Sequence, residues 1–116
     1  MKLETLVDLC LSKKGTTQEF PFDNKTMVFK VFGKIFALCN IEKWQNDQAS
    51  VNLKNVPEKN TELRENYASI VPGYHMNKKH WNTIHLWEEE LDDASIVELL
   101  EESYHLVAQK VPQKKN

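Results

Sequence analysis

The sequence lacks the segments by which several large classes of protein are identified. No apolar run approaches the roughly 20 residues that a membrane-spanning helix needs. The first residues, MKLETLVDLCLSKK, carry Glu4 and Asp8 inside an apolar pattern and lack the small-residue cleavage site of a secretory signal. A GxxxxGK[ST] phosphate loop and a GxGxxG segment are also absent. We therefore expect a cytoplasmic protein with no membrane segment and no standard nucleotide-hydrolysing motif.

Cysteine is scarce, and its spacing argues against both a disulfide and a catalytic thiol. Cys10 and Cys39 are the only two and form no CxxC pair. In a reducing compartment, two buried thiols are favoured over a disulfide. Neither cysteine adjoins a histidine, and there is no GxSxG elbow to present a nucleophilic serine. We expect no enzymatic activity and no cofactor.

The charge is unevenly distributed along a chain of otherwise ordinary composition. The 116 residues are 41% apolar and 28% charged, which fits one domain over residues 1–116, with 112–116 as a frayed tail. Residues 1–87 hold 12 Lys or Arg against 9 Asp or Glu, whereas residues 88–116 hold 3 against 8. No acidic side chain occurs from Asn66 to Trp87. The net charge of −2 argues against a protein that coats nucleic acid through bulk charge.

The hydrophobic pattern predicts helices at both ends of the chain and strands between them. Helices are expected at residues 3–10, 57–67 and 93–111, and strands at residues 17–22, 26–32, 35–41, 51–54 and 82–87. Residues 42–50 are polar and irregular. Gly33-Lys34 suits a type II′ hairpin turn, and Asp92 or Asp93 suits the cap of the last helix. The order α-β-β-β-β-α-β-α predicts an α+β fold with an antiparallel sheet covered on one face by helices.

Strand alternation divides the side chains of the sheet between two faces. The residues expected to face the helices are Met27, Phe29, Val31, Val51, Leu53, Ile84 and Leu86. The opposite face then carries Lys30, Asn52, Lys54, Thr83 and His85. This arrangement predicts a row of basic and amide groups on the uncovered side of the sheet. The alternative is that strand lysines serve only solubility and edge protection.

The stretch PGYHMNKKHW, residues 72–81, combines histidines, lysines, an amide and aromatic rings without a carboxylate. His75, His80 and His85 are spaced by five, with no HExxH segment and no cysteine beside them, so we expect no metal site. Lysines flanked by amide and aromatic groups suit contact with phosphates and bases.

A structural role for the same stretch is the alternative. Tyr74 and Trp81 would then anchor an irregular loop in the core, while Lys78 and Lys79 would be solvated charges without a ligand. Trp81 directly precedes a predicted strand, where a large aromatic side chain is more often packed than exposed.

Four segments together resemble one family of small bacterial proteins. FPFDNKTMVFKVFGKIFAL, VNLK, PGYHMNKKHWNTI and SYHLV occur in this order, and the chain resembles the MmcQ/YjbR family over nearly its whole length. The resemblance implies a CyaY-like, or frataxin-like, α+β fold and a predicted DNA-binding role. By position, the motif residues it carries over are Lys30, Lys54, Tyr74, His75, Met76, Asn77, Lys78, Lys79, His80, Trp81 and Asn82.

We therefore expect a non-enzymatic cytoplasmic module that binds DNA weakly. The expected nucleic-acid-binding residues are Lys30, Asn52, Lys54, Tyr74, His75, Asn77, Lys78, Lys79, His80 and Trp81. The alternative is a protein-interaction or small-ligand domain whose aromatic loop and sheet face form a pocket. A third possibility, frataxin-like metal handling, would need an acidic ridge on the first helix, which offers only Glu4 and Asp8.

Overall fold

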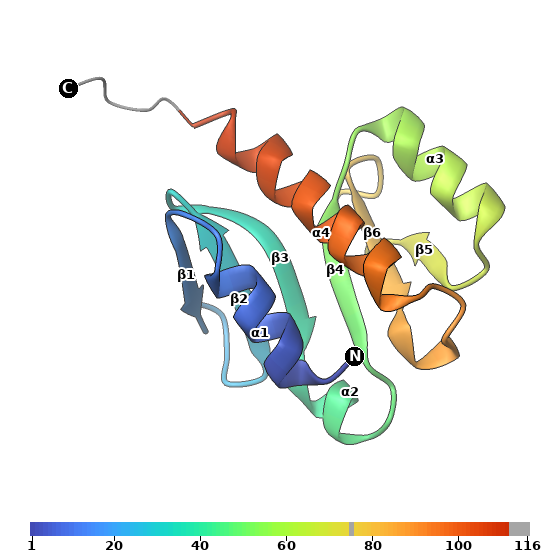
Figure 1. Cartoon of the computed structure of the whole chain (residues 1–116), viewed down its shortest axis with the longest axis horizontal. Helices are drawn as coiled ribbons and strands as arrows, with labels where there is room; N and C mark the ends of the chain where they lie inside the picture. Colours follow the sequence, from blue (N-terminus) through green and yellow to red (C-terminus); the bar gives the residue numbers. More distant parts are fainter. Residues whose placement is uncertain (75, 112–116) are drawn as a thin grey trace.

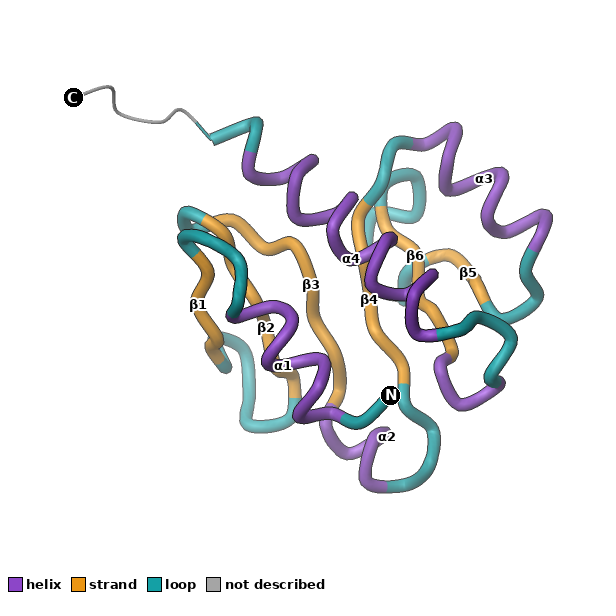
Figure 2. The backbone as a smooth tube through the Cα atoms, viewed as in Figure 1, coloured by secondary structure: helices purple, strands orange, loops and turns teal. Residues whose placement is uncertain are grey.

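A computed structural model of the chain describes residues 1–74 and 76–111 and contains one six-stranded antiparallel sheet (Figures 1 and 2). In chain order, the elements are α1 (Leu3–Leu11), β1 (Thr16–Glu19), β2 (Thr26–Val31), β3 (Lys34–Asn40), α2 (Ile41–Gln45), β4 (Ser50–Lys54), α3 (Pro57–Asn66), β5 (Ile70–Pro72), β6 (Trp81–His85), the 3₁₀ helix η1 (Leu86–Glu88) and α4 (Asp93–Ala108). The strand order is β1-β2-β3-β4-β6-β5. The predicted α+β fold with an antiparallel sheet is confirmed.

Helices α1 and α4 lie on the same face of the sheet (Figure 1), and the hydrophobic core lies beneath them. Alternate residues of β2, namely Met27, Phe29 and Val31, are buried in this core, as strand alternation predicts. The ring of Tyr104 on α4 packs edge-on against Phe36, with 5.4 Å between the ring centroids. Of the other residues predicted to face the helices, Val51, Leu53 and Ile84 also lie in this core, whereas Leu86 lies outside the strands. Among the described helices, none is long and apolar enough to cross a membrane.

Both cysteines are free and buried, as predicted. Burial raises the pKa of the Cys10 thiol to about 12, with Cys39 as a second cause, and burial likewise raises the pKa of Cys39 to about 12. The thiols are therefore protonated at neutral pH and serve as small apolar core groups.

Several segments of the structure differ from the prediction. Residues 42–50, expected to be irregular, begin within α2, which Asn40 caps by accepting a hydrogen bond from the Glu42 amide at 2.9 Å. The strand β5 has only three residues and was not predicted, because so short a run carries no periodicity. The last strand ends at His85, where η1 begins, so Leu86 and Trp87 lie outside it. Helix α4 ends at Ala108, and residues 112–116 of the expected tail lie outside the described residues.

The turn between β2 and β3 is shifted by one residue from the prediction. Its central residues are Phe32 and Gly33, with φ of 49° and 83°, and two positive values correspond to a type I′ turn. The ring of Phe32 packs on Gly15, whose own φ is 77°, and the Phe32 amide donates to the Gly15 carbonyl at 3.0 Å. A Cβ atom at residue 15 would overlap this ring, so glycine is required there.

The sheet divides between β3 and β4, which pair at only two positions, Ala37 with Leu53 and Leu38 with Asn52. The next pair in this register is Phe36 with Lys54, and the hydroxyl group of Ser103 from α4 lies between them. It accepts a hydrogen bond from the Lys54 amide at 2.8 Å and donates one to the Phe36 carbonyl at 2.6 Å. Beyond this point the two strands diverge (Figure 1).

Replacing Ser103 by alanine leaves the Lys54 amide and the Phe36 carbonyl without this partner. Because Ser103 is fully buried, we expect the free energy of unfolding to fall. The expected loss is about 1–3 kcal/mol in urea titrations. Ser12→Ala is the matched control, since its exposed hydroxyl bonds only the nearby Leu9 carbonyl, and it should change stability by less than about 0.5 kcal/mol. A Ser103→Ala protein as stable as the wild type would show that the strands can close directly.

Candidate functional site

The loop of residues 73–80 joins β5 to β6 and is closed by its own backbone. The carbonyl of Asn77 accepts hydrogen bonds from the amides of His80 at 3.2 Å and Trp81 at 3.0 Å, and its side chain accepts one from the Lys79 amide at 3.0 Å. At the base of the loop, the Gly73 amide donates to the Trp81 carbonyl at 2.8 Å. His75, a predicted site residue, lies outside the described residues.

Helix α3 holds this loop in place through two polar side chains. The Nδ2 group of Asn60, which is 1% exposed, donates to the Asn55 carbonyl at 3.1 Å and the Lys79 carbonyl at 2.9 Å. Its Oδ1 atom accepts a hydrogen bond from Asn82 Nδ2 at 3.0 Å. Arg64 donates from Nε to Asn82 Oδ1 at 2.6 Å and from Nη2 to the carbonyls of Lys78 and Trp81. The loop is therefore supported at the carbonyls of Lys78, Lys79 and Trp81 by one partly buried network.

Asn60 and Arg64 were not among the predicted site residues. The available signal was their spacing of four residues on α3, which places them on one side of the helix beside the buried Leu63. Asn82 was carried over only as a motif residue, and the structure shows that it links the two α3 side chains.

The predicted loop residues fall into two groups by exposure. Trp81 is 8% exposed and packs inside the molecule, which makes it an anchor of the loop. Tyr74 is 72% exposed, and its amide donates to the Thr83 hydroxyl at 3.3 Å. Lys78 and Lys79 are exposed, although the Lys78 ammonium group also donates to the Gly73 carbonyl at 3.2 Å. Tyr74, Asn77 and the two lysines are thus the exposed side chains among the predicted loop residues, and His80 is partly buried.

The sheet face opposite α1 and α4, here called the open face, carries a groove of about 560 Å³. Its lining includes Phe22, Leu38, Asn52, Tyr74, Met76 and Thr83. Asn52 donates to the Leu38 carbonyl at 3.2 Å and accepts from the Thr83 hydroxyl, so its amide group is engaged within the sheet. Phe22 is 67% exposed at one side of the groove, and Tyr74 stands at the loop side. The open-face groove is therefore mainly apolar, with exposed aromatic rings among its lining residues.

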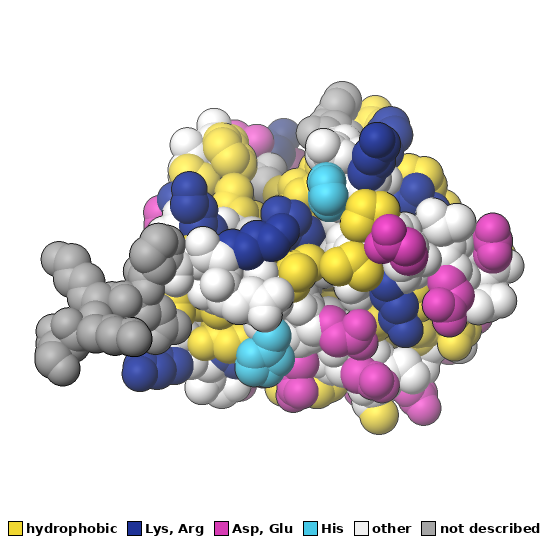
Figure 3. Space-filling model, turned by 90° about the horizontal axis from the view of Figure 1, so that it is seen from above, with side chains coloured by type: hydrophobic (Ala, Val, Ile, Leu, Met, Phe, Trp, Pro, Cys, Tyr) yellow, Lys and Arg dark blue, Asp and Glu magenta, His cyan; other side chains and the backbone are white. Residues whose placement is uncertain are grey.

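A second hollow, of about 530 Å³, lies where β3 and β4 diverge, and we call it the lysine cleft. It is lined by Lys30, Gly33, Lys34, Ile35, Lys54, Val107, Lys110 and Val111. Seen from this end, Lys and Arg side chains gather in the middle of the face, and Asp and Glu lie toward the lower right (Figure 3). Burial, with Lys110 as the second cause, lowers the pKa of Lys54 below its ordinary value. Ile35 also lines the open-face groove, so the two hollows adjoin.

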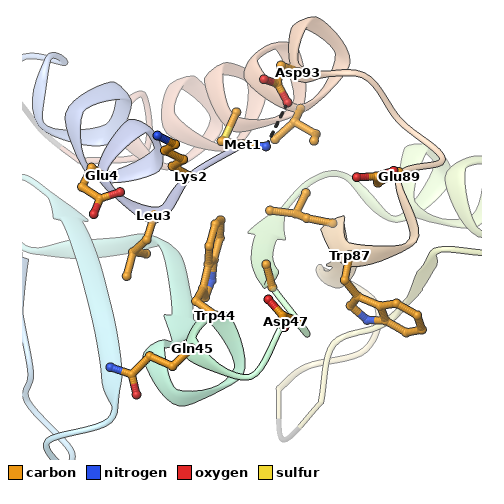
Figure 4. A pocket seen from close by; sticks show the side chains of 13 residues that line it. Met1, Lys2, Leu3, Glu4, Trp44, Gln45, Asp47, Trp87, Glu89 and Asp93 are labelled. Carbon is orange, nitrogen blue, oxygen red and sulfur yellow. Dashed lines mark ion pairs between the residues drawn. The ribbon is translucent and has the colours of Figure 1, made fainter.

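A third hollow, of about 840 Å³, contains none of the predicted site residues. It lies around the start of α1 and the α2 segment, and its lining mixes Trp44 and Trp87 with acidic and basic groups (Figure 4). The indole nitrogen of Trp44 donates to the Ser50 carbonyl at 2.9 Å. In the part of the chain that the structure describes, no three His, Cys, Asp or Glu side chains form a group that could hold a metal ion.

The chain is similar to known proteins over most of its length. The YjbR family model matches residues 11–106. The protein YbdF of Escherichia coli O157:H7 is 38% identical over 104 residues, covering 90% of this chain and 82% of the relative. The protein YjbR of Escherichia coli K12 is 31% identical over 115 residues, covering 99% and 94%.

Two solved structures share the fold. The crystal structure of a DUF419-domain protein from Deinococcus radiodurans has a TM-score of 0.87 at 36% identity, covering 97% of this chain and 83% of that one. A crystal structure from Pseudomonas syringae has a TM-score of 0.75 at 28% identity, covering 92% and 99%.

Replacing Asn60 by alanine removes its hydrogen bonds to the Asn55 carbonyl, to the Lys79 carbonyl of the loop and to Asn82. Because these groups are buried or partly buried, we expect a loss of unfolding free energy of about 1–3 kcal/mol. Amide chemical shifts of residues 77–82 should move at the same time. Asn66→Ala, at an exposed position near the end of the same helix, should leave both quantities nearly unchanged. Unaltered loop shifts in Asn60→Ala would contradict the support of the loop by α3.

Proposed function

The chain belongs to the YjbR family, and from the surface that its fold leaves uncovered we propose a non-enzymatic module that binds DNA through the 73–80 loop and the open face. The resemblance found in the sequence is thereby confirmed at the level of the family. The observation that carries the proposal is the continuity of two hollows. An apolar groove that includes exposed aromatic residues adjoins the lysine cleft at Ile35.

The shape of this surface favours a single strand over a duplex. In a duplex, the bases are stacked inside and only their edges and the phosphates reach the surface, whereas a single strand offers the faces of its bases. The exposed ring of Tyr74 can stack on such a face, and the groove beside it can enclose part of the base. The lysines of the cleft and the exposed Lys78 and Lys79 would then contact phosphates.

The net charge predicts that this binding is weak. With three or four phosphates neutralised, we expect a dissociation constant of roughly 10⁻⁴ to 10⁻⁶ M near physiological salt. For a single strand, the slope of log K against log salt should be roughly −2 to −3. Such a weak affinity suits a module that meets DNA at high local concentration or binds it together with a partner.

A small ligand without nucleic acid is the second candidate function, because the size of the open-face groove favours it. Its volume of about 560 Å³ lies within the range of roughly 300–1,000 Å³ that is usual for small-molecule sites. The apolar part of such a ligand would contact Leu38 and Met76. This candidate needs no base stacking on Tyr74.

Two finer features of the sequence prediction belong to this proposal. A relation to the CyaY fold is supported by an antiparallel sheet with α1 and α4 on one face. A cytoplasmic location is supported by the two free, buried thiols, which suit a reducing compartment.

Anisotropy titrations with a labelled oligo-dT strand and a duplex of equal length test the proposal. Tyr74→Ala should weaken binding of the single strand by about 1–3 kcal/mol through loss of stacking. The control is Trp87→Ala, which removes an aromatic ring that is half exposed in the third hollow and should leave the affinity unchanged. Failure of both DNA forms to bind at low salt would reject DNA binding and leave the small-ligand function.

A second variant tests the charge contribution of the loop. Lys78→Ala combined with Lys79→Ala should reduce the steepness of the salt dependence by up to about 1.4, because two phosphate contacts are lost. Both side chains are exposed, so urea unfolding should detect a stability change within about 0.5 kcal/mol for each. An unchanged salt slope would assign the two lysines to solvation alone.

A further inference from the structure

The lysine cleft exists because the two halves of the sheet separate at Ser103. The hydroxyl of Ser103 occupies the place of the next contact between β3 and β4, so the strands diverge beyond it. The opening is bounded by the β2–β3 hairpin on one side, by the end of β4 on the other, and by residues at and beyond the end of α4. Lys54 lies directly at the point of division, since its own amide binds Ser103.

Four lysines from separate parts of the chain line this opening. Lys30 and Lys34 come from the hairpin, Lys54 from β4, and Lys110 from the segment after α4. No Asp or Glu is among the described residues that line the cleft. Within residues 1–74 and 76–111, only Lys30 of the four has an ion-pair partner, Glu19, with 3.2 Å between Nζ and Oε1. A chain with a net charge of −2 thus concentrates ammonium groups around one hollow.

Such a concentration of like charges is unfavourable until an anion enters. The lowered pKa of Lys54, caused by burial and then by Lys110, agrees with a site in which positive charge is poorly compensated. An anion placed among the lysines would counter both causes of the lowered Lys54 pKa. It would screen the repulsion between the ammonium groups, and it would replace their lost hydration with charged hydrogen bonds.

We propose that the lysine cleft binds a phosphate monoester group. A phosphate monoester carries about −1.5 to −2 charges at neutral pH and offers three acceptor oxygens, which several lysines can share. A phosphodiester in mid-strand carries one charge and continues in two directions, whereas the cleft is bounded by Val107 and Val111 beside the end of α4. The organic part of the ligand extends past Ile35 into the open-face groove.

Two sources can supply this group, the phosphorylated end of a strand or a phosphorylated small molecule. A strand end as the source depends on the proposed DNA binding, whereas the binding of a phosphate group to the cleft does not. The test therefore uses three probes: inorganic phosphate, oligo-dT with a 5′-phosphate, and the same oligonucleotide with a 5′-hydroxyl group.

Amide chemical shifts of isotope-labelled protein are followed during titration with inorganic phosphate at constant ionic strength, with chloride as the reference anion. We expect saturable shifts at Gly33, Lys34 and Lys54. Loss of one charged hydrogen bond should weaken phosphate binding about tenfold or more in Lys54→Gln, and likewise in Lys110→Gln. Lys2→Gln, an exposed lysine that lines the third hollow instead, should bind phosphate like the wild type. Shifts that do not saturate, or that chloride reproduces, would overturn the proposal.

The oligonucleotides separate this inference from the proposed function. Tighter binding of the 5′-phosphorylated strand, lost in Lys54→Gln, supports a strand end as the source. Saturable phosphate binding without binding of either oligonucleotide supports the cleft with a small-molecule source and rejects the DNA function. Binding of both oligonucleotides with equal affinity, together with no saturable phosphate shift, rejects the monoester site and leaves DNA binding in place.

Discussion

The side chain of Ser103 holds the sheet open at one point, and the remaining architecture depends on that contact. Its hydroxyl satisfies the Lys54 amide and the Phe36 carbonyl at once, so neither buried group is left unpaired when the strands separate. The sheet can therefore consist of two three-stranded parts, β1-β2-β3 and β4-β6-β5, that share a short contact and one covering helix. Without such a substitute partner, the separation would be costly and the strands would close.

This division also explains how a slightly acidic chain can present a basic surface. Three lysines of the cleft come from β2, β3 and β4 and the fourth follows α4, and no Asp or Glu is among the described residues that line the cleft. The loop on the far part is fixed by Asn60 and Arg64 of α3, which bind backbone carbonyls of the loop. The support of the loop thus comes from helix side chains that bind its backbone, while Tyr74 and Lys79 are exposed on the loop.

The sequence predicted those features that follow from local periodicity. Alternation in β2 and β4 placed Phe29 and Val51 in the core, and the junction position of Trp81 indicated its burial. The predicted type of the β2–β3 turn was wrong, because phenylalanine rarely adopts a positive φ. The packing of the Phe32 ring on Gly15 accounts for this conformation. Ser103 could not be found in advance, since one serine within an amphipathic helix carries no pattern. Lys54 and Lys110 meet the two hairpin lysines only through the tertiary arrangement of β4 and α4, which no local signal contains.

The packing of Phe32 on Gly15 links the end of α1 to the tip of the hairpin that carries Lys34. This link restricts the order in which the two positions can change during evolution. A larger residue at position 15 is sterically possible only after position 32 has changed to a smaller side chain. If position 15 changes first, its Cβ atom clashes with the Phe32 ring. Even then, the backbone at residue 15 keeps a left-handed conformation with φ of 77°, which costs a residue with a Cβ atom roughly 1–2 kcal/mol. Any other residue at position 15 therefore meets both a steric clash with Phe32 and the cost of the left-handed backbone. A smaller residue at position 32 removes only the clash.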